Sequence, residues 1–339
     1  MKRVLAARQD NNGDVLLTGP ALRAIAASAQ VTLLCGPRGA AAAQTLPGVR
    51  DVIVREAQWI DAEPSAVSGD DVQSFIADVR ARRFHEAIIF TSFHQSPLPL
   101  ALLLRMAGVP RIGAISVDYP GSLLDVRHRV SDDIHEVERA LSLAHAMGYD
   151  LPQSDHARLM MGGLPAGVSL PFEEYVVVHP GATVPARAWF PERNAELVAR
   201  LCNAGYNVVV TGGHAEHALT RAVAGGNANA LDLGGKTSFI EFAAVVRDAA
   251  AVVSGNTAAA HVASATGTPV VSIFPPTIPA LRFRPWMVPY ALLGDQDAPC
   301  AGCRARVCPV PGQPCLDSVT VDAVFDAVQS IARVRAEVA

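Results

Sequence analysis

The sequence predicts an α/β protein with two domains, each built on a parallel sheet, and a cleft between them. A chain of 339 residues is longer than one typical domain. Short apolar runs alternate with helix-like stretches in both halves, as in parallel sheets with crossover helices. A stretch rich in Gly and Pro separates the halves. We therefore expect an N-terminal domain at 1–160, a linker at 161–174 and a C-terminal domain at 175–339.

The N-terminal half contains five strand candidates and five helix candidates. Apolar runs that end at small or polar residues predict the strands, and longer amphipathic stretches predict the helices. The expected strands are 4–7, 31–35, 52–54, 87–90 and 111–114, and the expected helices are 21–29, 40–46, 72–82, 98–107 and 132–147.

The C-terminal half repeats the alternation. The expected strands are 175–178, 207–211, 230–233, 251–254 and 270–274, and the expected helices are 193–204, 215–224, 238–248, 257–266 and 319–338. The last of these is a candidate to pack back onto the N-terminal domain.

Composition excludes several classes of partner and location. The formal net charge of −4 argues against nucleic-acid binding, which needs a basic surface. Polar residues interrupt the apolar start too early for a secretory signal, and no apolar stretch reaches the length of about 18 residues that a membrane helix requires. We expect a cytoplasmic protein, with peripheral contact to a membrane surface left open. The sequence predicts no particular oligomeric state.

A carboxylate follows the first predicted strand. Gly13 and Asp14 lie in the presumed turn between that strand and the helix expected from Ala21. Ligand sites of open parallel sheets lie at such turns. Asp14 there is compatible with a catalytic base or with a helix N-cap, which Asp also favours.

Four turns of the C-terminal half are small or polar, and each follows a predicted strand. They lie at 179–183, 211–213, 233–238 and 254–258. Gly allows close backbone approach, and the helix start that follows offers free amides to phosphate. Neither the G-x-G-x-x-G dinucleotide fingerprint nor the G-x-x-x-x-G-K-[ST] loop occurs at these places. The pattern favours a nucleotide or sugar-nucleotide site.

These motifs together resemble glycosyltransferase family 9, the ADP-heptose:lipopolysaccharide heptosyltransferases and their relatives. The resemblance spans nearly the whole chain in the same order. The matching residues are Arg8, Gly13, Asp14 and Pro20, the run 178–182 with Arg187 and Trp189, Gly212 and Gly213, the run 233–238, the run 254–257 with His261, and the run 267–271.

The resemblance implies a GT-B fold of two Rossmann-like domains and inverting transfer without a metal, as in lipopolysaccharide biosynthesis. The N-terminal domain would take a glycan or small-molecule acceptor, and the C-terminal domain an ADP-sugar carrying a heptose or a related sugar. Asp14 would deprotonate the acceptor hydroxyl. The implied donor-binding residues are Gly181, Ala182, Thr183, Arg187, Gly212, Gly213, Glu216, Lys236, Thr237, Asn256, Thr257, Ala258 and His261.

Several donor-side residues have more than one possible role. Arg187 could grip phosphate oxygens or form a surface ion pair. Glu216 could take ribose hydroxyls or be an ordinary helix charge, and His261 could contact the donor or be a buried structural histidine. Asn256 stands where many heptosyltransferases carry Asp, so the identity of the donor sugar is in doubt.

The expected acceptor-side residues are Asp10, Gly13, His94 and Gln95. The turn position of Asp10 favours a solvated side chain over a second site carboxylate. His94 and Gln95 could instead cap the helix that follows. His135 and Glu136 are expected to be structural.

A Pro-rich loop near the C-terminus holds Cys300, Cys303, Cys308 and Cys315. Four thiols so close together are compatible with a structural zinc site, although the spacing differs from paired C-x-x-C ribbons. These cysteines could equally bind no ligand, have a redox role or form a disulfide.

Two other functions fit the same motifs. A nucleotide-sugar epimerase or hydrolase would bind the same donor, and a non-catalytic protein would bind it without turnover. The joint presence of Asp14 and Arg187 favours the transferase.

Overall fold

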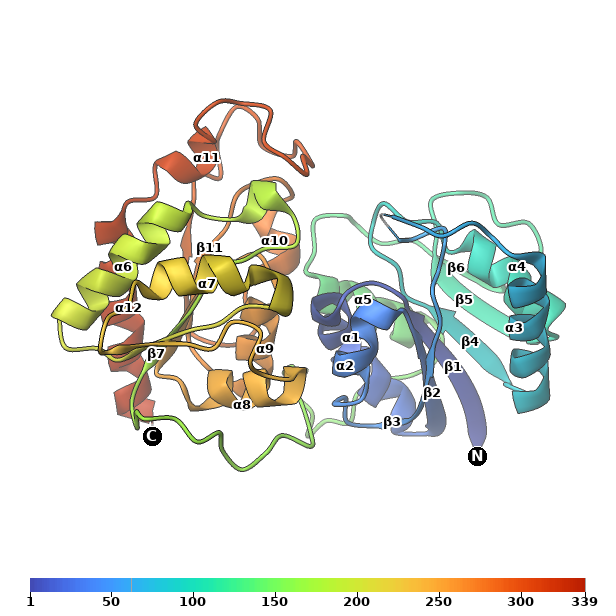
Figure 1. Cartoon of the computed structure of the whole chain (residues 1–339). Helices are drawn as coiled ribbons and strands as arrows, with labels where there is room; N and C mark the ends of the chain where they lie inside the picture. The colour runs from blue at the N-terminus through green and yellow to red at the C-terminus, as the bar shows by residue number, and fades with distance from the viewer. Residues whose placement is uncertain (62, 339) are drawn as a thin grey trace. The chain divides into compact units, whose positions relative to one another are not determined.

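The computed structural model describes residues 1–61 and 63–338 of the chain. It divides into two compact units, Met1–Gly162 and Gly163–Ala339, which we call the N-terminal and C-terminal units (Figure 1).

The N-terminal unit is built on a six-stranded sheet with the order β3-β2-β1-β4-β5-β6. All neighbouring strands run parallel, with Val4 of β1 paired to Val31 of β2 and to Glu86 of β4. The strands are β1 Lys2–Arg8, β2 Ala29–Cys35, β3 Val49–Val54, β4 Glu86–Ile89, β5 Arg111–Ile115 and β6 Val126–His128. The helices are α1 Asn12–Ala26, η1 Pro37–Gly39, α2 Ala40–Ala43, α3 Gly69–Arg82, α4 Leu98–Met106 and α5 Glu136–Ala146.

Helices cover both faces of this sheet. The neighbours α1 and α5 lie on one face, and α3 and α4 on the other (Figure 1). Strand β1 is therefore buried on both sides, which explains its continuous apolar run Val4–Ala7. Phe75 and Val79 of α3 and Leu100 and Leu104 of α4 form one apolar core with the sheet.

The C-terminal unit repeats this architecture with the strand order β12-β11-β10-β7-β8-β9, again parallel throughout. Helices α6, α7 and α12 pack on one face, and α8 and α9 pack together on the other. The strands are β7 Val176–His179, β8 Val208–Val210, β9 Ala230–Asp232, β10 Ala251–Gly255, β11 Val270–Ile273 and β12 Tyr290–Leu293. The helices are η2 Pro185–Arg187, α6 Pro191–Asn203, η3 His214–Glu216, α7 His217–Ala224, α8 Phe239–Asp248, α9 Ala258–Thr266, α10 Ala280–Phe283, α11 Pro314–Asp317 and α12 Val321–Val338.

Several predicted elements have different bounds in the structure. Helix α1 begins at Asn12, directly after β1, so the expected turn around Gly13 is already helical. The helix predicted at 132–147 begins at Glu136, because the His135 side chain caps it by accepting from the Val137 amide. The prediction missed the edge strands β6 and β12.

Both sheets have the strand order of a doubly wound Rossmann fold, in which the first strand lies between the second and the fourth. The chain changes direction across the sheet between β1 and β4, and again between β7 and β10. Ligands of such sheets bind at the carboxyl ends of the strands flanking this point. The residues that follow these four strands are therefore the candidates for a ligand site.

Among residues 1–61 and 63–338, no helix combines the length and the apolar character needed to span a membrane.

Candidate active site

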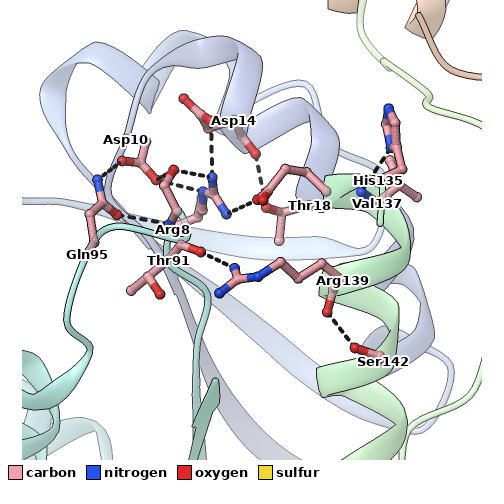
Figure 2. A network of polar contacts seen from close by, with 12 residues as sticks. Arg8, Asp10, Asp14, Thr18, Thr91, Gln95, His135, Val137, Arg139 and Ser142 are labelled. Atoms are coloured by element: carbon pink, nitrogen blue, oxygen red, sulfur yellow. Dashed lines mark hydrogen bonds and ion pairs between the residues drawn. The ribbon is translucent and has the colours of Figure 1, made fainter. Parts of the chain in front are cut away.

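A buried arginine surrounded by three carboxylates lies at the end of β1. Its Nε lies 2.8 Å from Asp10 Oδ2, its Nη2 3.1 Å from Asp14 Oδ1 and its Nη1 3.4 Å from Glu136 Oε2. Figure 2 shows Arg8 at the centre, with Asp10 and Asp14 around it. These four side chains, the Arg8 cluster, come from β1, the residues after it, α1 and the first turn of α5.

The Arg8 cluster is buried and carries more negative than positive charge. One guanidinium faces three carboxylates, and the side chains of Arg8, Asp10 and Glu136 are at most 7% exposed. Burial alone lowers the pKa of Arg8, but the attraction of the three acids outweighs it, so its pKa is raised and the guanidinium stays charged. For Asp14, the negative charges of Asp10 and Glu136 oppose ionisation.

Asp14 is the member of the cluster best placed to transfer a proton. Its side chain is 19% exposed, the most of the three acids. Burial first, then the charge of Asp10, raise the pKa of Asp14 to about 6, against the opposing pull of Arg8. A carboxylate with this pKa is ionised at neutral pH and is a stronger base than an ordinary aspartate.

The N-cap alternative for Asp14 is wrong. Asn11 is the N-cap of α1, and Asp14 lies inside the first helical turn, where its backbone carbonyl accepts from Thr18 Oγ1 at 3.0 Å. Gly13 occupies the helical position just before it. A negative side chain in the first turn is stabilised by the helix dipole, so α1 also positions this carboxylate.

The residues after β4 complete the cluster. Ser92 Oγ accepts from Arg8 Nη2 at 3.0 Å. The Gln95 side chain accepts from the Ser92 amide at 3.0 Å and donates to Asp10 (Figure 2). Asp10 is thus buried and ion-paired, which corrects the solvated-turn alternative. Of the two acceptor-side candidates after β4, Gln95 is half-buried against Asp10, whereas His94 is exposed.

In the C-terminal unit a second polar group lies at the ends of β7 and β8. His179 Nδ1 lies 3.0 Å from Thr211 Oγ1, and Glu216 Oε2 accepts from the Gly213 amide at 2.7 Å. Burial lowers the pKa of His179, opposed by the charge of Glu216. The bond between the Gly213 amide and Glu216 forms a capping box at the start of η3, so Glu216 lies against the loop after β8 and its contact with ribose stays a prediction.

Glycine at position 181 makes room for Glu216. A Cβ at Gly181 would lie 1.9 Å from Glu216 Oε1, and one at Gly212 would lie 2.7 Å from Thr220 Cγ2. Without side chains, the loops after β7 and β8 can lie against this acid. Ala182 is half-buried and Thr183 exposed in the same loop.

The end of β10 brings together most of the other donor-side candidates. Asn256 and His261 are buried, at 7% and 4% exposure. Thr257 caps α9 by accepting from the Ala259 amide, and Ala258 opens the helix. The segment carrying Arg187 lies close by, since a Cβ at Gly255 would come within 2.8 Å of the Arg187 carbonyl oxygen. The start of a helix carries the positive end of its dipole, which suits an anionic group.

Lys236 and Thr237 lie beyond the edge strand β9, two strands from β7. The Lys236 ammonium donates to the Asp232 carbonyl at 2.6 Å and lies 3.9 Å from the Asp232 carboxylate. The loop that carries this lysine lies against the loop after β8, because the Gly235 amide donates to the Gly212 carbonyl at 3.0 Å.

The four clustered cysteines do not form a metal site in the described part of the chain, where no group of three or more His, Cys, Asp or Glu is arranged to hold an ion. Cys315 is buried in the core of its unit, whereas Cys303 is exposed. Burial, and then the charges of Cys300, Cys308 and Cys303, raise the pKa of Cys315, so the four thiols lie near one another. A structural zinc site, one of the alternatives given above, is not confirmed.

Sequence reasoning missed two parts of the site. Arg8 was matched only as a motif residue, and Glu136 was taken as structural. The available signal was an arginine ending a fully apolar strand, because a buried charge needs partners of opposite sign. No local pattern showed that α5, more than a hundred residues away, supplies one of them.

Comparison with known proteins identifies the class. The family model "Glycosyltransferase family 9 (heptosyltransferase)" matches residues 73–313. The two Rossmann-like domains correspond to the GT-B fold, and the chain belongs to glycosyltransferase family 9.

Individual relatives agree with this assignment. Lipopolysaccharide heptosyltransferase 1 of Pseudomonas aeruginosa is 31% identical over 182 residues, covering 51% of this chain and 48% of the relative. The chain thus matches about half of that protein's length. The solved structure of Escherichia coli ADP-heptose lipopolysaccharide heptosyltransferase II has a TM-score of 0.75 at 19% identity, with 99% of this chain and 100% of that one covered. Escherichia coli heptosyltransferase WaaC with ADP has a TM-score of 0.74 at 22% identity, with 97% and 99% covered.

Proposed function

We propose that the protein is an inverting, metal-independent glycosyltransferase that moves a heptose or a related sugar from an ADP-sugar to a hydroxyl of a glycan or small-molecule acceptor. One observation carries the proposal: Asp14 is the accessible carboxylate of the Arg8 cluster, and its pKa is raised to about 6.

Asp14 acts as the general base. It accepts the proton of the acceptor hydroxyl while that oxygen forms a bond to the anomeric carbon of the donor. The bond from this carbon to the diphosphate oxygen breaks, and its electron pair leaves with the nucleoside diphosphate. Attack opposite the leaving group inverts the anomeric configuration. Asp10 and Glu136 raise the basicity of Asp14, and Arg8 keeps it oriented.

The C-terminal unit binds the donor. Arg187 and the amides at the start of α9 stabilise charge on the departing diphosphate, which is the role that a metal has in other transferases. Glu216 accepts from ribose hydroxyls, and Asn256 and His261 face the sugar and the phosphates. The name of the WaaC structure, which includes ADP, supports an adenine nucleotide here.

A donor panel tests the proposal on the full chain. Calorimetry with ADP-, UDP- and GDP-sugars should give selective binding of the ADP-sugar, and transfer to an acceptor should invert the anomeric centre and survive EDTA. Selective binding of a UDP- or GDP-sugar would overturn the donor assignment. Retention of configuration would overturn the mechanism, and loss of activity in EDTA the independence from metal.

A further inference from the structure

The loop between β12 and α11, residues 294–313, links two segments at the strand ends of the C-terminal unit. We call it the cysteine loop, because it carries three of the four clustered cysteines. The Gly302 amide donates to the Pro276 carbonyl at 2.7 Å and the Arg304 amide to the Thr277 carbonyl at 3.0 Å, which ties the loop to the segment after β11. The loop also bonds to η2, which follows β7. Because β10 lies between β11 and β7 in the sheet, these contacts lie on either side of the strand that leads into α9.

Two hydrogen bonds from the cysteine loop meet at Ala186, the residue before Arg187. The Ala186 amide donates to the Arg306 carbonyl at 3.0 Å, and the Ala186 carbonyl accepts from Gln313 Nε2 at 2.8 Å. That carbonyl belongs to the same peptide group as the Arg187 amide, which donates to the Val184 carbonyl at 2.8 Å. Both ends of the peptide that leads into Arg187 are therefore hydrogen-bonded, one of them by a side chain of the cysteine loop.

The same segment also lies against the sheet. Ala186 is buried, and a Cβ at Gly255, the last residue of β10, would come within 2.8 Å of the Arg187 carbonyl oxygen. Trp189, two residues further on, is buried and its indole donates to the Val319 carbonyl at 3.3 Å. The backbone of Arg187 is thus held by the end of β10 and by the cysteine loop, and its position depends on both.

The backbone of Gln313 has an unusual conformation. Its dihedral angles, φ 45° and ψ 64°, are left-handed, which costs energy for a residue with a side chain. The surrounding turn holds this conformation, because the Gln313 amide donates to the Val310 carbonyl and its carbonyl accepts from the amides of Leu316 and Asp317. Leu316 is fully buried in the core of the unit. Strained residues persist where the structure around them fixes them, and here the strain coincides with a side chain that bonds the segment of Arg187.

We propose that the cysteine loop braces the segment of Arg187, with Gln313 as the positioning residue that sets where the guanidinium meets the donor diphosphate. The inference rests on the donor role proposed above for Arg187. Gln313 acts through the peptide between Ala186 and Arg187 and needs no contact with the donor. A side-chain amide suits this task, because it donates to a carbonyl without adding a charge near the phosphates.

A double-mutant cycle on the full chain tests this role, with ADP affinity measured by calorimetry. Gln313→Met keeps nearly the same length and lacks the donor, so it should weaken ADP binding about 3- to 10-fold through the loss of one hydrogen bond. In a chain that already carries Arg187→Met, the same substitution should change the affinity by less than about 2-fold, because the residue on which Gln313 acts is gone. Equal losses in the two chains, or no loss in either, would overturn the proposal.

A second variant, Gln313→Gly, separates positioning from stability. Glycine removes the same donor but adopts left-handed dihedral angles without strain, so relief of the strain offsets the lost bond. The midpoint of thermal unfolding should therefore stay close to the parent value while ADP binding weakens as in Gln313→Met. Gln329→Met, at a half-buried glutamine of α12, is the matched control and should bind ADP as the parent does. A Gln313→Gly chain with parental ADP affinity would refute the positioning role.

Hydrogen exchange of residues 182–190, measured without ligand, distinguishes this inference from the donor role of Arg187. Loss of the Gln313 bond should speed exchange in this segment, because local opening becomes easier. If Arg187→Met binds ADP as the parent does, the donor role is contradicted, and faster exchange in the Gln313 variants still supports the brace. Unchanged exchange in both Gln313 variants would overturn the brace, whatever the outcome for the donor role.

Discussion

Arg8 holds three carboxylates at the end of β1, and the surplus of negative charge sets the chemistry of Asp14. A single buried ion pair would lower the pKa of an aspartate. Here burial and the neighbouring acids outweigh the guanidinium, so the pKa of Asp14 is raised to about 6. The cluster therefore raises the basicity of Asp14, the residue that we propose as the general base.

The first prediction concerns pH. Because only ionised Asp14 can accept a proton, kcat/KM should fall as the pH drops through about 6. Asp10→Asn removes a neighbouring charge that raises this pKa, so the acidic limb of the pH profile should move to lower pH. Asp70→Asn, an exposed aspartate in the first turn of α3, should leave the limb in place. A limb that is the same in the Asp10 variant and the parent would refute the electrostatic account.

The second prediction concerns stability. Arg8→Met leaves three carboxylates buried together without a counter-charge, and loss of one partner of a buried ion pair typically costs about 3–5 kcal/mol. Urea denaturation followed by circular dichroism should show this loss. Arg3→Met, at an exposed position of the same strand, should change the free energy of unfolding by less than about 1 kcal/mol. Equal effects of the two substitutions would mean that Arg8 has no special structural role.

Some properties of these residues could be predicted from the sequence, and others could not. Asp14 could be singled out because it follows an apolar strand and matches a family motif. The raised pKa of Asp14 could not be predicted, because Glu136 joins the site only through tertiary packing of α5. A role for Asp10 was foreseen, but its burial against Arg8 was not.

Among the elements, helix α1 positions Asp14, the proposed base. It starts four residues after β1 ends, so Asp14 occupies the first turn. The prediction set the helix start at Ala21 because Gly13 and Pro20 are poor helix formers. The structure accommodates both, with Pro20 inside the helix. Tertiary packing of α1 on α5 overrides local propensity here.

All the central strands were predicted, whereas two of the four edge strands, β6 and β12, were missed. Parallel strands covered on both faces read as continuous apolar runs, as in β1 and β7. The edge strands β6 and β12 are largely half-buried and short, so their sequences lack that signal.

The third prediction tests the loop after β7. A Cβ at Gly181 would collide with the Glu216 carboxylate, so Gly181→Ala should displace this acid from the strand ends. We expect ADP binding, measured by calorimetry, to weaken by about tenfold, or about 1.4 kcal/mol. Gly167→Ala, where a Cβ would meet nothing within 4 Å, should bind ADP as the parent does. Unchanged affinity in the Gly181 variant would remove Glu216 from the proposed donor site.

At the scale of the whole molecule, the chain repeats one topology in its two units and uses each differently. Both sheets place polar residues at the ends of the strands that flank the change of direction. In the N-terminal unit these residues form the Arg8 cluster, in which the pKa of Asp14 is raised. In the C-terminal unit they combine small loops, a helix start and Arg187. Two α/β domains could be predicted from the alternation of strands and helices, whereas strand order could not, because it depends on long-range pairing.

The most direct test of the central claim compares donor binding and turnover in a single variant. Asp14→Asn keeps the shape of the side chain and removes the base, so ADP-sugar affinity should stay at the parent value while the transfer rate falls by about 10²- to 10⁴-fold. Asp70→Asn should retain both. Near-parental turnover in Asp14→Asn, with binding intact, would contradict the assignment of Asp14 as the base.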